Sequence, residues 1–278
     1  MNRVFWKELW LLLVCAFMGI AILMTVMPLL GLMEMNNVQF LHVMQWLQTV
    51  FVMILPALFW YWWRTKKNPV KEFGFSRINK RLLILTFCFM VVSVPALEFI
   101  TVVNYNMPVP ETVRPFLDEM KAQNFETTSQ LMDLDGIGGW IELILLVCAG
   151  TAVAEETMFR GALYKCFEHT TIGRHWVACF VGLIFSLVHF DPSGFFPRWI
   201  LGSFFCYLVI WSGSIWPSIL AHALNNLFAL IEFKNATGHN PLEPAEMRFS
   251  WYLVLLSFVL SVVIIWLLQQ KTTSFQSE

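Results

Sequence analysis

Apolar runs long enough to cross a lipid bilayer recur along almost the whole chain. They lie near residues 9–31, 40–63, 82–104, 140–167, 175–190, 196–212, 215–232 and 251–268. A transmembrane helix needs about 20 mostly apolar residues, and inside lipid only helices and closed barrels satisfy their own backbone hydrogen bonds. A hydrophobic fraction of 58% and a charged fraction of 13% are typical of a multi-spanning membrane protein. The sequence therefore predicts an all-α, polytopic membrane helical bundle with about eight transmembrane helices.

The basic residues fall mainly on one side of these predicted helices. With the N-terminus inside, most of the 18 Lys and Arg residues lie on or towards the cytoplasm, and the exceptions are Arg114, Lys121, Arg198, Lys234 and Arg248. The positive-inside rule then predicts that both termini are cytoplasmic. The chain is compact and shows no organellar targeting signal, which favours a prokaryotic plasma (inner) membrane. The net charge of -1 argues against a nucleic-acid partner, so the expected partners are the bilayer and a substrate within it.

No repeat or second domain is visible, so residues 1–278 are expected to form one integral membrane domain. The longest polar stretch, residues 105–135, is predicted to be an extracytoplasmic loop that acts as a connector, with a short surface helix beginning near Pro110. Residues 271–278 are predicted to be a disordered tail. The six cysteines lie singly in apolar runs and are interpreted as small hydrophobic residues.

Three ionisable side chains lie within six residues near the middle of the fourth apolar run, namely Glu155, Glu156 and Arg160. A charge at the centre of a bilayer costs at least ~2.5 kcal/mol, so each needs a partner, water or a function. Glu156 and Arg160 are four residues apart with the acid first, which favours an ion pair on one helix face. Glu155 points about 100° away from Glu156. We therefore predict that Glu156 and Arg160 support the fold and that Glu155 is free to act chemically.

Two further polar clusters lie inside later apolar runs. His189 closes one run, and His222 and Asn226 are four residues apart in another, so that both can be aimed at one point while Asn225 faces elsewhere. A rise of about 1.5 Å per residue places Glu155 and His189 at similar depths, roughly 20 and 22 Å from one membrane face, and His222 shallower at roughly 10 Å. We expect these four groups to share a pocket.

A carboxylate, two imidazoles and a carboxamide in a low-dielectric cavity suit hydrolysis. Glu155 can take a proton from water, and His189 can orient that water or transfer the proton. His222 and Asn226 can donate hydrogen bonds to the oxyanion that develops on an attacked carbonyl. The same set, with Glu155, His189 and His222 as ligands, could instead bind zinc. Residue types and spacing leave both the metal-free and the zinc mechanism open.

Other polar residues are assigned structural roles. A single intramembrane histidine is often a hydrogen-bonded contact between helices. The histidines near helix ends or in loops are assigned to this class: His42, His169, His175 and His239. Glu98 is a further intramembrane acid, beside Pro95, and is expected to lie outside the site.

Three motifs carry a family resemblance: Glu155-Glu156-x-x-x-Arg160, Phe185-x-x-x-His189 and His222-x-x-x-Asn226. In this order and spacing they resemble the motifs of the CAAX-protease and bacteriocin-processing (CPBP, or ABI) family of intramembrane proteases, with a family-like core at about 140–232. The resemblance implies an all-helical fold of about eight spans and peptide-bond hydrolysis in a cavity open to one membrane face.

The resemblance also implies roles for the matching residues. Glu155 and His189 match the water-activating pair, His222 and Asn226 match the oxyanion-stabilising pair, and Glu156 and Arg160 match supporting positions. Members are called metalloproteases, although a metal-free, glutamate-activated mechanism is also proposed for them. The implied substrate is a peptide or membrane protein, prenylated as for the type II CAAX prenyl endopeptidases or linked to bacteriocin maturation and immunity.

Two other functional classes stay open at this stage. The same buried polar residues could serve a non-catalytic membrane scaffold or immunity protein, or a proton-coupled transporter. A transporter would be favoured by inverted repeats, which the sequence does not show. A scaffold would tolerate Glu155→Gln, whereas a hydrolase would lose its turnover.

Overall fold

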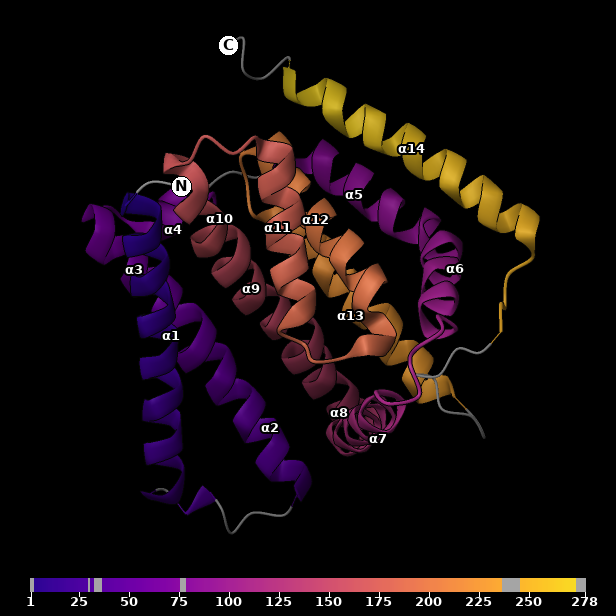
Figure 1. Cartoon of the computed structure of the whole chain (residues 1–278), viewed down its shortest axis with the longest axis horizontal. Coiled ribbons are helices and arrows are strands. Elements are labelled where there is room, and N and C mark those ends of the chain that lie inside the picture. The colour runs from indigo at the N-terminus through magenta and orange to yellow at the C-terminus, as the bar shows by residue number, and fades with distance from the viewer. Residues whose placement is uncertain (1–2, 30, 33–36, 76–78, 237–245, 274–278) are drawn as a thin grey trace.

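The computed structural model describes residues 3–29, 31–32, 37–75, 79–236 and 246–273. Within these ranges every regular element is a helix, which confirms the all-α prediction (Figure 1). Five helices are long and apolar enough to cross a membrane: Arg3–Leu29, Val38–Thr65, Gly136–His169, Pro192–Ser212 and Trp251–Gln270. The apolar helices make this a multi-pass membrane protein.

The predicted count of about eight spans is not confirmed. A sixth candidate is a pair of helices, α5 (Lys80–Val92) and α6 (Val94–Tyr105), bent by 50°. The helix α11 (Arg174–Leu187) is too short to count, and α13 (Trp216–Asn235) is absent from the candidates within the described residues. The polar residues of α13, among them His222 and Asn226, explain its lower hydropathy.

The first two spans form an antiparallel pair at one side of the bundle (Figure 1). The first is α1 (Arg3–Leu29), and the second runs without a break through α2 (Asn37–Gln48), the π-helical η2 (Thr49–Ile54) and α3 (Leu55–Thr65). The one-turn helix α4 (Pro69–Glu72) follows, and its first free N–H, on Val70, donates to the Asn68 side chain at 3.0 Å. This segment reaches the central helices, because Phe73 packs in the same core as Phe159 and Ala162.

The bend between α5 and α6 is stabilised by a side chain from the last helix, α14 (Trp251–Thr273). The Ala96 N–H donates to the Ser257 hydroxyl at 3.1 Å, and that hydroxyl donates to the Val92 carbonyl at 2.6 Å. Ser257 thus bridges a donor and an acceptor four residues apart, next to Pro95. In a membrane such polar groups need a protein partner, so the bend and α14 are coupled.

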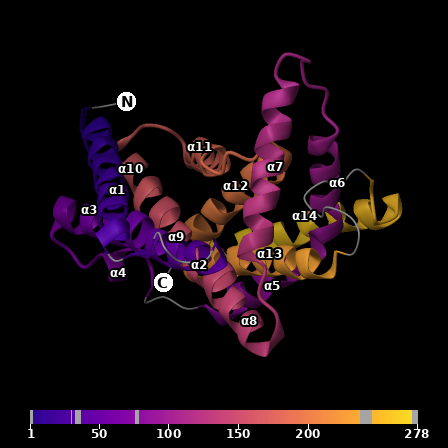
Figure 2. The same ribbon diagram turned by 90° about the horizontal axis from the view of Figure 1, so that it is seen from below.

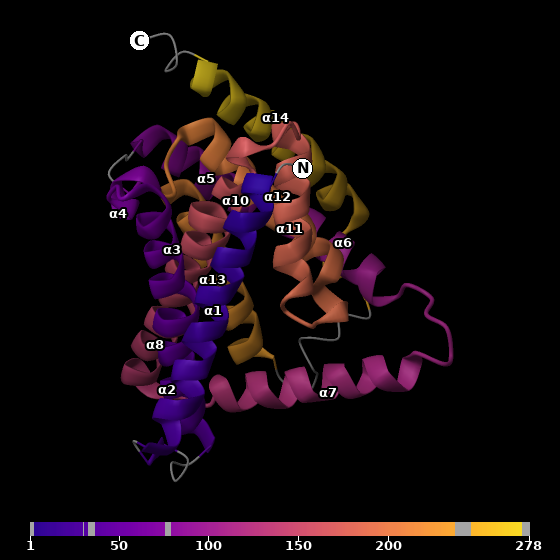
Figure 3. The ribbon, with the colours of Figure 1, turned by 60° about the vertical axis from the view of Figure 1, so that its left-hand side comes forward.

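The predicted loop at 105–135 contains a helix much longer than expected. This helix, α7, begins at Arg114 rather than near Pro110 and continues to Leu131. It lies across one end of the bundle (Figures 2 and 3). The buried His42 joins it to α2 and to the next helix, with Nδ1 2.7 Å from Glu142 and Nε2 2.8 Å from the Leu131 carbonyl oxygen.

The central helices hold the polar clusters. One continuous span, Gly136–His169, is built from α8 (Gly136–Leu143), η3 (Ile144–Gly150), α9 (Thr151–Glu156), η4 (Thr157–Leu163), α10 (Tyr164–Cys166) and η5 (Phe167–His169), and α11, α12 (Phe195–Ser212) and α13 pack beside it. The helices α11 and α12 approach closely at two glycines. A Cβ placed on Gly182 would lie 2.5 Å from the Ser203 backbone nitrogen, and one on Gly202 would lie 3.0 Å from the Gly182 Cα.

The end of the chain differs in part from the prediction. The helix α14 continues to Thr273, three residues into the stretch expected to be a disordered tail. Residues 274–278 lie outside the described residues. His239 lies outside them too.

Candidate active site

The central span supplies the three ionisable residues from a part of the helix that changes its hydrogen-bonding pattern. The α-helical turns of α9 lie between two π-helical segments, η3 and η4. Glu155 and Glu156 end α9, and Arg160 lies in η4. Short π-helical segments are frequent at functional sites. A wider turn shifts the following side chains around the helix axis and leaves neighbouring carbonyls available for tertiary bonds.

The predicted ion pair between Glu156 and Arg160 is confirmed. Arg160 Nη1 lies 2.7 Å from Glu156 Oε1, and both side chains are fully buried. Arg160 Nη2 donates to the Gly202 carbonyl at 2.7 Å, and the guanidinium lies 4.7 Å from the Phe185 ring centroid. Two hydrogen bonds and an aromatic face therefore stabilise a charge that would be costly if it were alone.

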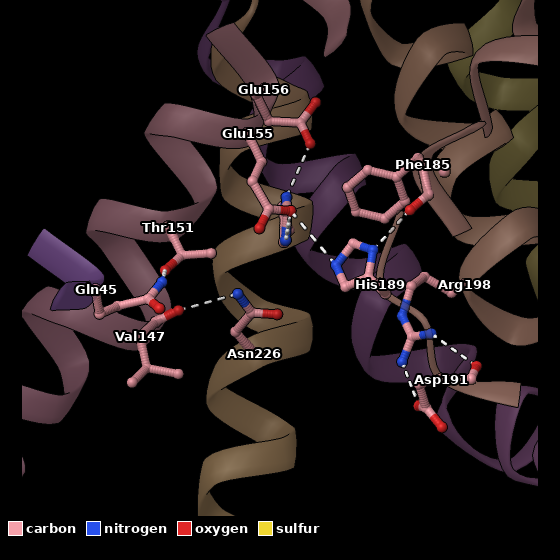
Figure 4. A network of polar contacts seen from close by, with 12 residues as sticks. Gln45, Val147, Thr151, Glu155, Glu156, Phe185, His189, Asp191, Arg198 and Asn226 are labelled. Carbon is pink, nitrogen blue, oxygen red and sulfur yellow. Dashed lines mark hydrogen bonds and ion pairs between the residues drawn. The ribbon is translucent and has the colours of Figure 1, made fainter. Parts of the chain in front are cut away.

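Both predicted histidines converge on a single oxygen of Glu155, and Figure 4 shows the approach of His189. Glu155 Oε2 lies 3.8 Å from His189 Nε2 and 3.7 Å from His222 Nε2. These distances are too long for direct hydrogen bonds, and within the described chain this buried oxygen has no hydrogen-bond partner. Separations of this size leave room for a small group that contacts the acid and an imidazole together.

The other nitrogen of each histidine is held by a neighbouring group. His189 lies just beyond α11, and its Nδ1 is 2.6 Å from the Phe185 carbonyl oxygen. Since a carbonyl can only accept, Nδ1 carries the proton, and in the neutral ring Nε2 presents a lone pair towards Glu155. His222 is buried in α13, stacks on Phe205 with a ring-centroid separation of 5.4 Å, and places Nδ1 2.8 Å from Glu156 Oε1.

This last contact adds a second partner to the supporting role predicted for Glu156. One carboxylate oxygen accepts from Arg160 and faces the His222 imidazole as well. Sequence spacing shows the first partner but not the second, because His222 comes from another helix. The buried pair therefore also orients a residue of the candidate site.

The two asparagines of α13 differ from expectation. Asn226 does not point with His222 at Glu155; its amide donates to the Val147 carbonyl of η3 at 3.0 Å (Figure 4). Asn225, expected to face elsewhere, lines the same cavity as Asn226. The face of α13 that carries both amides is turned towards the cavity. Helical periodicity shows which residues share a face, but it does not show which way that face is turned.

A cavity of about 230 Å³ lies beside these groups. Its lining includes His189, His222, Asn225 and Asn226, together with aromatic side chains such as Phe185 and Phe205. Glu155 is not among the lining residues, but its side chain is 15% exposed and contacts both lining histidines. Small-molecule and peptide sites typically combine apolar walls with a few convergent polar groups, as this cavity does.

An ion pair that the sequence does not predict also lines this cavity. Arg198 Nη2 lies 2.7 Å from Asp191 Oδ2, and Arg198 Nη1 donates to the Asp191 backbone carbonyl at 3.3 Å (Figure 4). The signal that could have found it is proximity in sequence, because both residues lie within nine positions of His189. Both charged side chains therefore lie beside the cavity in which we expect a substrate to bind.

Glu98 lies elsewhere, as expected, and is not among the cavity residues. It is buried and clamps the segment before α14. One Glu98 oxygen accepts from the Arg248 backbone N–H, and the other lies 3.0 Å from Arg248 Nη2. Arg248 Nη1 also lies 2.6 Å from Glu232 Oε1.

The set of side chains has donor atoms suitable for zinc but not the spacing. Two imidazole nitrogens and a carboxylate oxygen are common zinc ligands at about 2.0–2.2 Å from the metal. Across the described ranges, no group of three His, Cys, Asp or Glu side chains is arranged to hold a metal ion. The residues as placed do not fit zinc, and no chemical step below uses a metal. The zinc expectation stays a prediction for experiment.

The fold and the site together define a class: a multi-pass helical membrane protein with one glutamate, two histidines and two asparagines gathered at a buried cavity. Comparison with known proteins finds a similarity over part of the chain. Residues 138–228 match the family described as type II CAAX prenyl endopeptidase Rce1-like. The match includes Glu155, His189, His222 and Asn226 and confirms the resemblance predicted from the three motifs. No curated protein and no solved structure matches the chain.

Proposed function

We propose that this protein is an intramembrane endopeptidase in which Glu155 activates a water molecule for attack on a peptide bond. One observation carries the proposal. The Nε2 atoms of His189 and His222 both lie within 3.8 Å of the same unpartnered Glu155 oxygen, beside a polar cavity. The family match, to a group of proteases, supports the same reaction type.

The proposed reaction begins with water held between Glu155 and His189. Both groups present lone pairs, so one water can donate a proton to each while its own lone pair faces the substrate carbonyl. The oxygen attacks the carbonyl carbon, Glu155 takes a proton, and negative charge develops on the carbonyl oxygen. When the C–N bond breaks, that proton passes to the leaving amine, which gives an amine and a carboxylic acid, and the acid then releases the second water proton to the surrounding water.

We assign the stabilisation of the developing oxyanion to His222 and Asn226. Glu156 Oε1 lies 2.8 Å from His222 Nδ1 and so orients the ring with Nε2 towards Glu155, where an Nε2–H would donate to the oxyanion. Asn226 has a second amide hydrogen beyond the one given to Val147. Asn226 must turn towards the substrate for this role, or donate with that second hydrogen.

The proposed substrate is a peptide or a segment of a membrane protein, since the cavity lies among apolar helices. Prenylated C-terminal peptides and bacteriocin precursors are the two candidate classes that the family suggests. We further propose a prokaryotic plasma membrane location with both termini in the cytoplasm.

The experiment is a product analysis. Purified protein in proteoliposomes is incubated with prenylated and unprenylated peptides, and the new termini are identified by mass spectrometry. Cleavage by the wild type that is absent from His189→Ala supports the proposal. Absence of cleavage of every peptide class by a folded wild-type protein would favour the scaffold or transporter alternative.

A further inference from the structure

A second cavity, of about 370 Å³, lies on the other side of the Glu156–Arg160 pair. Arg160 lines this second cavity, whereas the other partner of Glu156, His222, lines the first. The volume falls within the ~300–1,000 Å³ typical of small-molecule sites. The chemistry proposed above makes no use of this cavity.

The lining of the second cavity is strongly basic. Lys71 comes from α4, Lys165 from α10 and Arg174 from the start of α11, and the acid among the lining residues is Glu72. Lys165 is paired with Glu168 at 2.9 Å. Among the described residues, Lys71 and Arg174 have no salt-bridge partner. Three separate segments therefore bring positive charge to one hollow, and two of these charges are not neutralised.

Arg160 adds a buried donor to this lining. Its Nη1 and Nη2 are bonded to Glu156 and to the Gly202 carbonyl, but its Nε has no hydrogen-bond partner within the described chain. The residue is 1% exposed. A buried N–H without a partner costs about 1–3 kcal/mol, so an acceptor reaching it from the cavity would be stabilising.

The second cavity lies near one end of the bundle, where the exposed side chains lead us to expect the lipid headgroups. Figure 1 shows α3, α4 and α10 at the same end of the bundle. Exposed tryptophans surround this end, with Trp62 45%, Trp63 54% and Trp176 65% exposed. Lys66 Nζ lies 4.2 Å from the Trp62 ring centroid and 4.5 Å from that of Trp63. Exposed tryptophans and basic side chains mark the membrane–water interface, where lipid phosphates are concentrated.

We propose that the second cavity binds a phosphate group, held by Lys71, Arg174 and Arg160. Phosphate oxygens match the donors of guanidinium and ammonium groups, and basic pockets between membrane helices bind anionic headgroups. The headgroup of an anionic lipid such as phosphatidylglycerol is the source favoured by the position of the cavity. A soluble phosphate has the same chemistry and is distinguished below.

The test uses full-length protein purified from membranes containing phosphatidylglycerol and phosphatidylcholine, with retained lipid counted by native mass spectrometry. We expect one tightly retained phosphatidylglycerol in the wild type. The double variant Lys71→Ala/Arg174→Ala should bind it about 10- to 30-fold more weakly, since each basic residue near anionic lipid contributes about 1 kcal/mol. Lys67→Ala is the matched control, because Lys67 is exposed on the same connection and does not line the cavity.

Inorganic phosphate separates the two sources. If millimolar phosphate displaces the lipid, the site exists and its ligand is a soluble phosphate. If the lipid is retained, the site exists and its ligand is the lipid headgroup. Equal lipid binding by wild type and double variant would overturn the proposal. An equal loss in Lys67→Ala would also overturn it, because attraction would then be spread over the surface. The single variants Lys71→Ala and Arg174→Ala replace the double variant if its unfolding midpoint in phosphatidylcholine falls.

Discussion

The Nδ1 atom of His222 lies 2.8 Å from Oε1 of Glu156, a buried carboxylate oxygen that also accepts from Arg160. This contact joins the structural ion pair to the candidate catalytic histidine. We therefore propose that Glu156 is a positioning residue, which acts through the orientation of His222. Outer partners of this kind influence activity without touching substrate.

Replacing Glu156 by Gln should lower kcat by about 10- to 100-fold while KM changes little, because such outer partners have effects of this size. Gln keeps an acceptor for His222 but loses the negative charge, and the buried Arg160 then loses its anion, so the unfolding midpoint should fall as well. The measurement is steady-state hydrolysis by folded protein, with circular dichroism as the check on folding. A change confined to KM, or wild-type kinetics, would contradict the positioning role.

Arg160→Ala should destabilise the protein by about 3–5 kcal/mol, because it leaves the buried Glu156 without its cation. Glu155→Ala is the matched comparison. Glu155 has no hydrogen-bond partner on Oε2 and should cost much less to remove. Thermal unfolding in detergent measures both variants, and equal midpoints would show that the ion pair does not stabilise the fold.

The two neighbouring asparagines provide a matched pair for the oxyanion role. Asn226→Ala should lower kcat by about 10²- to 10³-fold, the usual effect of removing one oxyanion donor. Asn225→Ala, which alters the same cavity, should have a much smaller effect on kcat. The measurement is kcat of both variants on the same peptide. Similar losses of kcat in the two variants would show that the shape of the cavity, and not an oxyanion donor, is responsible.

Activity should survive chelation, and the active protein should contain well below one zinc per chain. The reason is the spacing of the described His, Cys, Asp and Glu side chains, in which no group of three is arranged around a common metal position. Elemental analysis of purified, active protein measures the content. One zinc per active chain would show that Glu155, His189 and His222 rearrange to ligate it.

Local geometry determined which parts of the site could be predicted. The Glu156–Arg160 pair follows from helical spacing, since residues four apart on a helix are neighbours. The approach of His189 and His222 to Glu155 followed from polar residues at intramembrane positions, although depth estimates placed His222 too shallow. Their common oxygen could not be predicted, because it depends on how separate helices pack.

Tertiary contacts explain what the sequence did not show. The count of about eight spans is not confirmed, because α11 is short and α13 carries polar side chains on an otherwise apolar helix. The bend between α5 and α6 depends on a hydroxyl from α14, which is more than 150 residues away in sequence. The Arg198–Asp191 pair lines the cavity because of how the chain after His189 folds back. Its position could not be predicted from the sequence.

The turnover of Glu155→Gln tests the central claim most directly. Gln has nearly the same shape as Glu but cannot take a proton from water, so the protein should fold normally and lose nearly all peptide hydrolysis. Glu111→Gln is the matched control, because Glu111 is 84% exposed and does not line the cavity. Single-turnover cleavage in proteoliposomes is the measurement. Loss of cleavage in Glu155→Gln alone, at an unchanged unfolding midpoint, is the predicted result, and wild-type cleavage by Glu155→Gln would contradict the account.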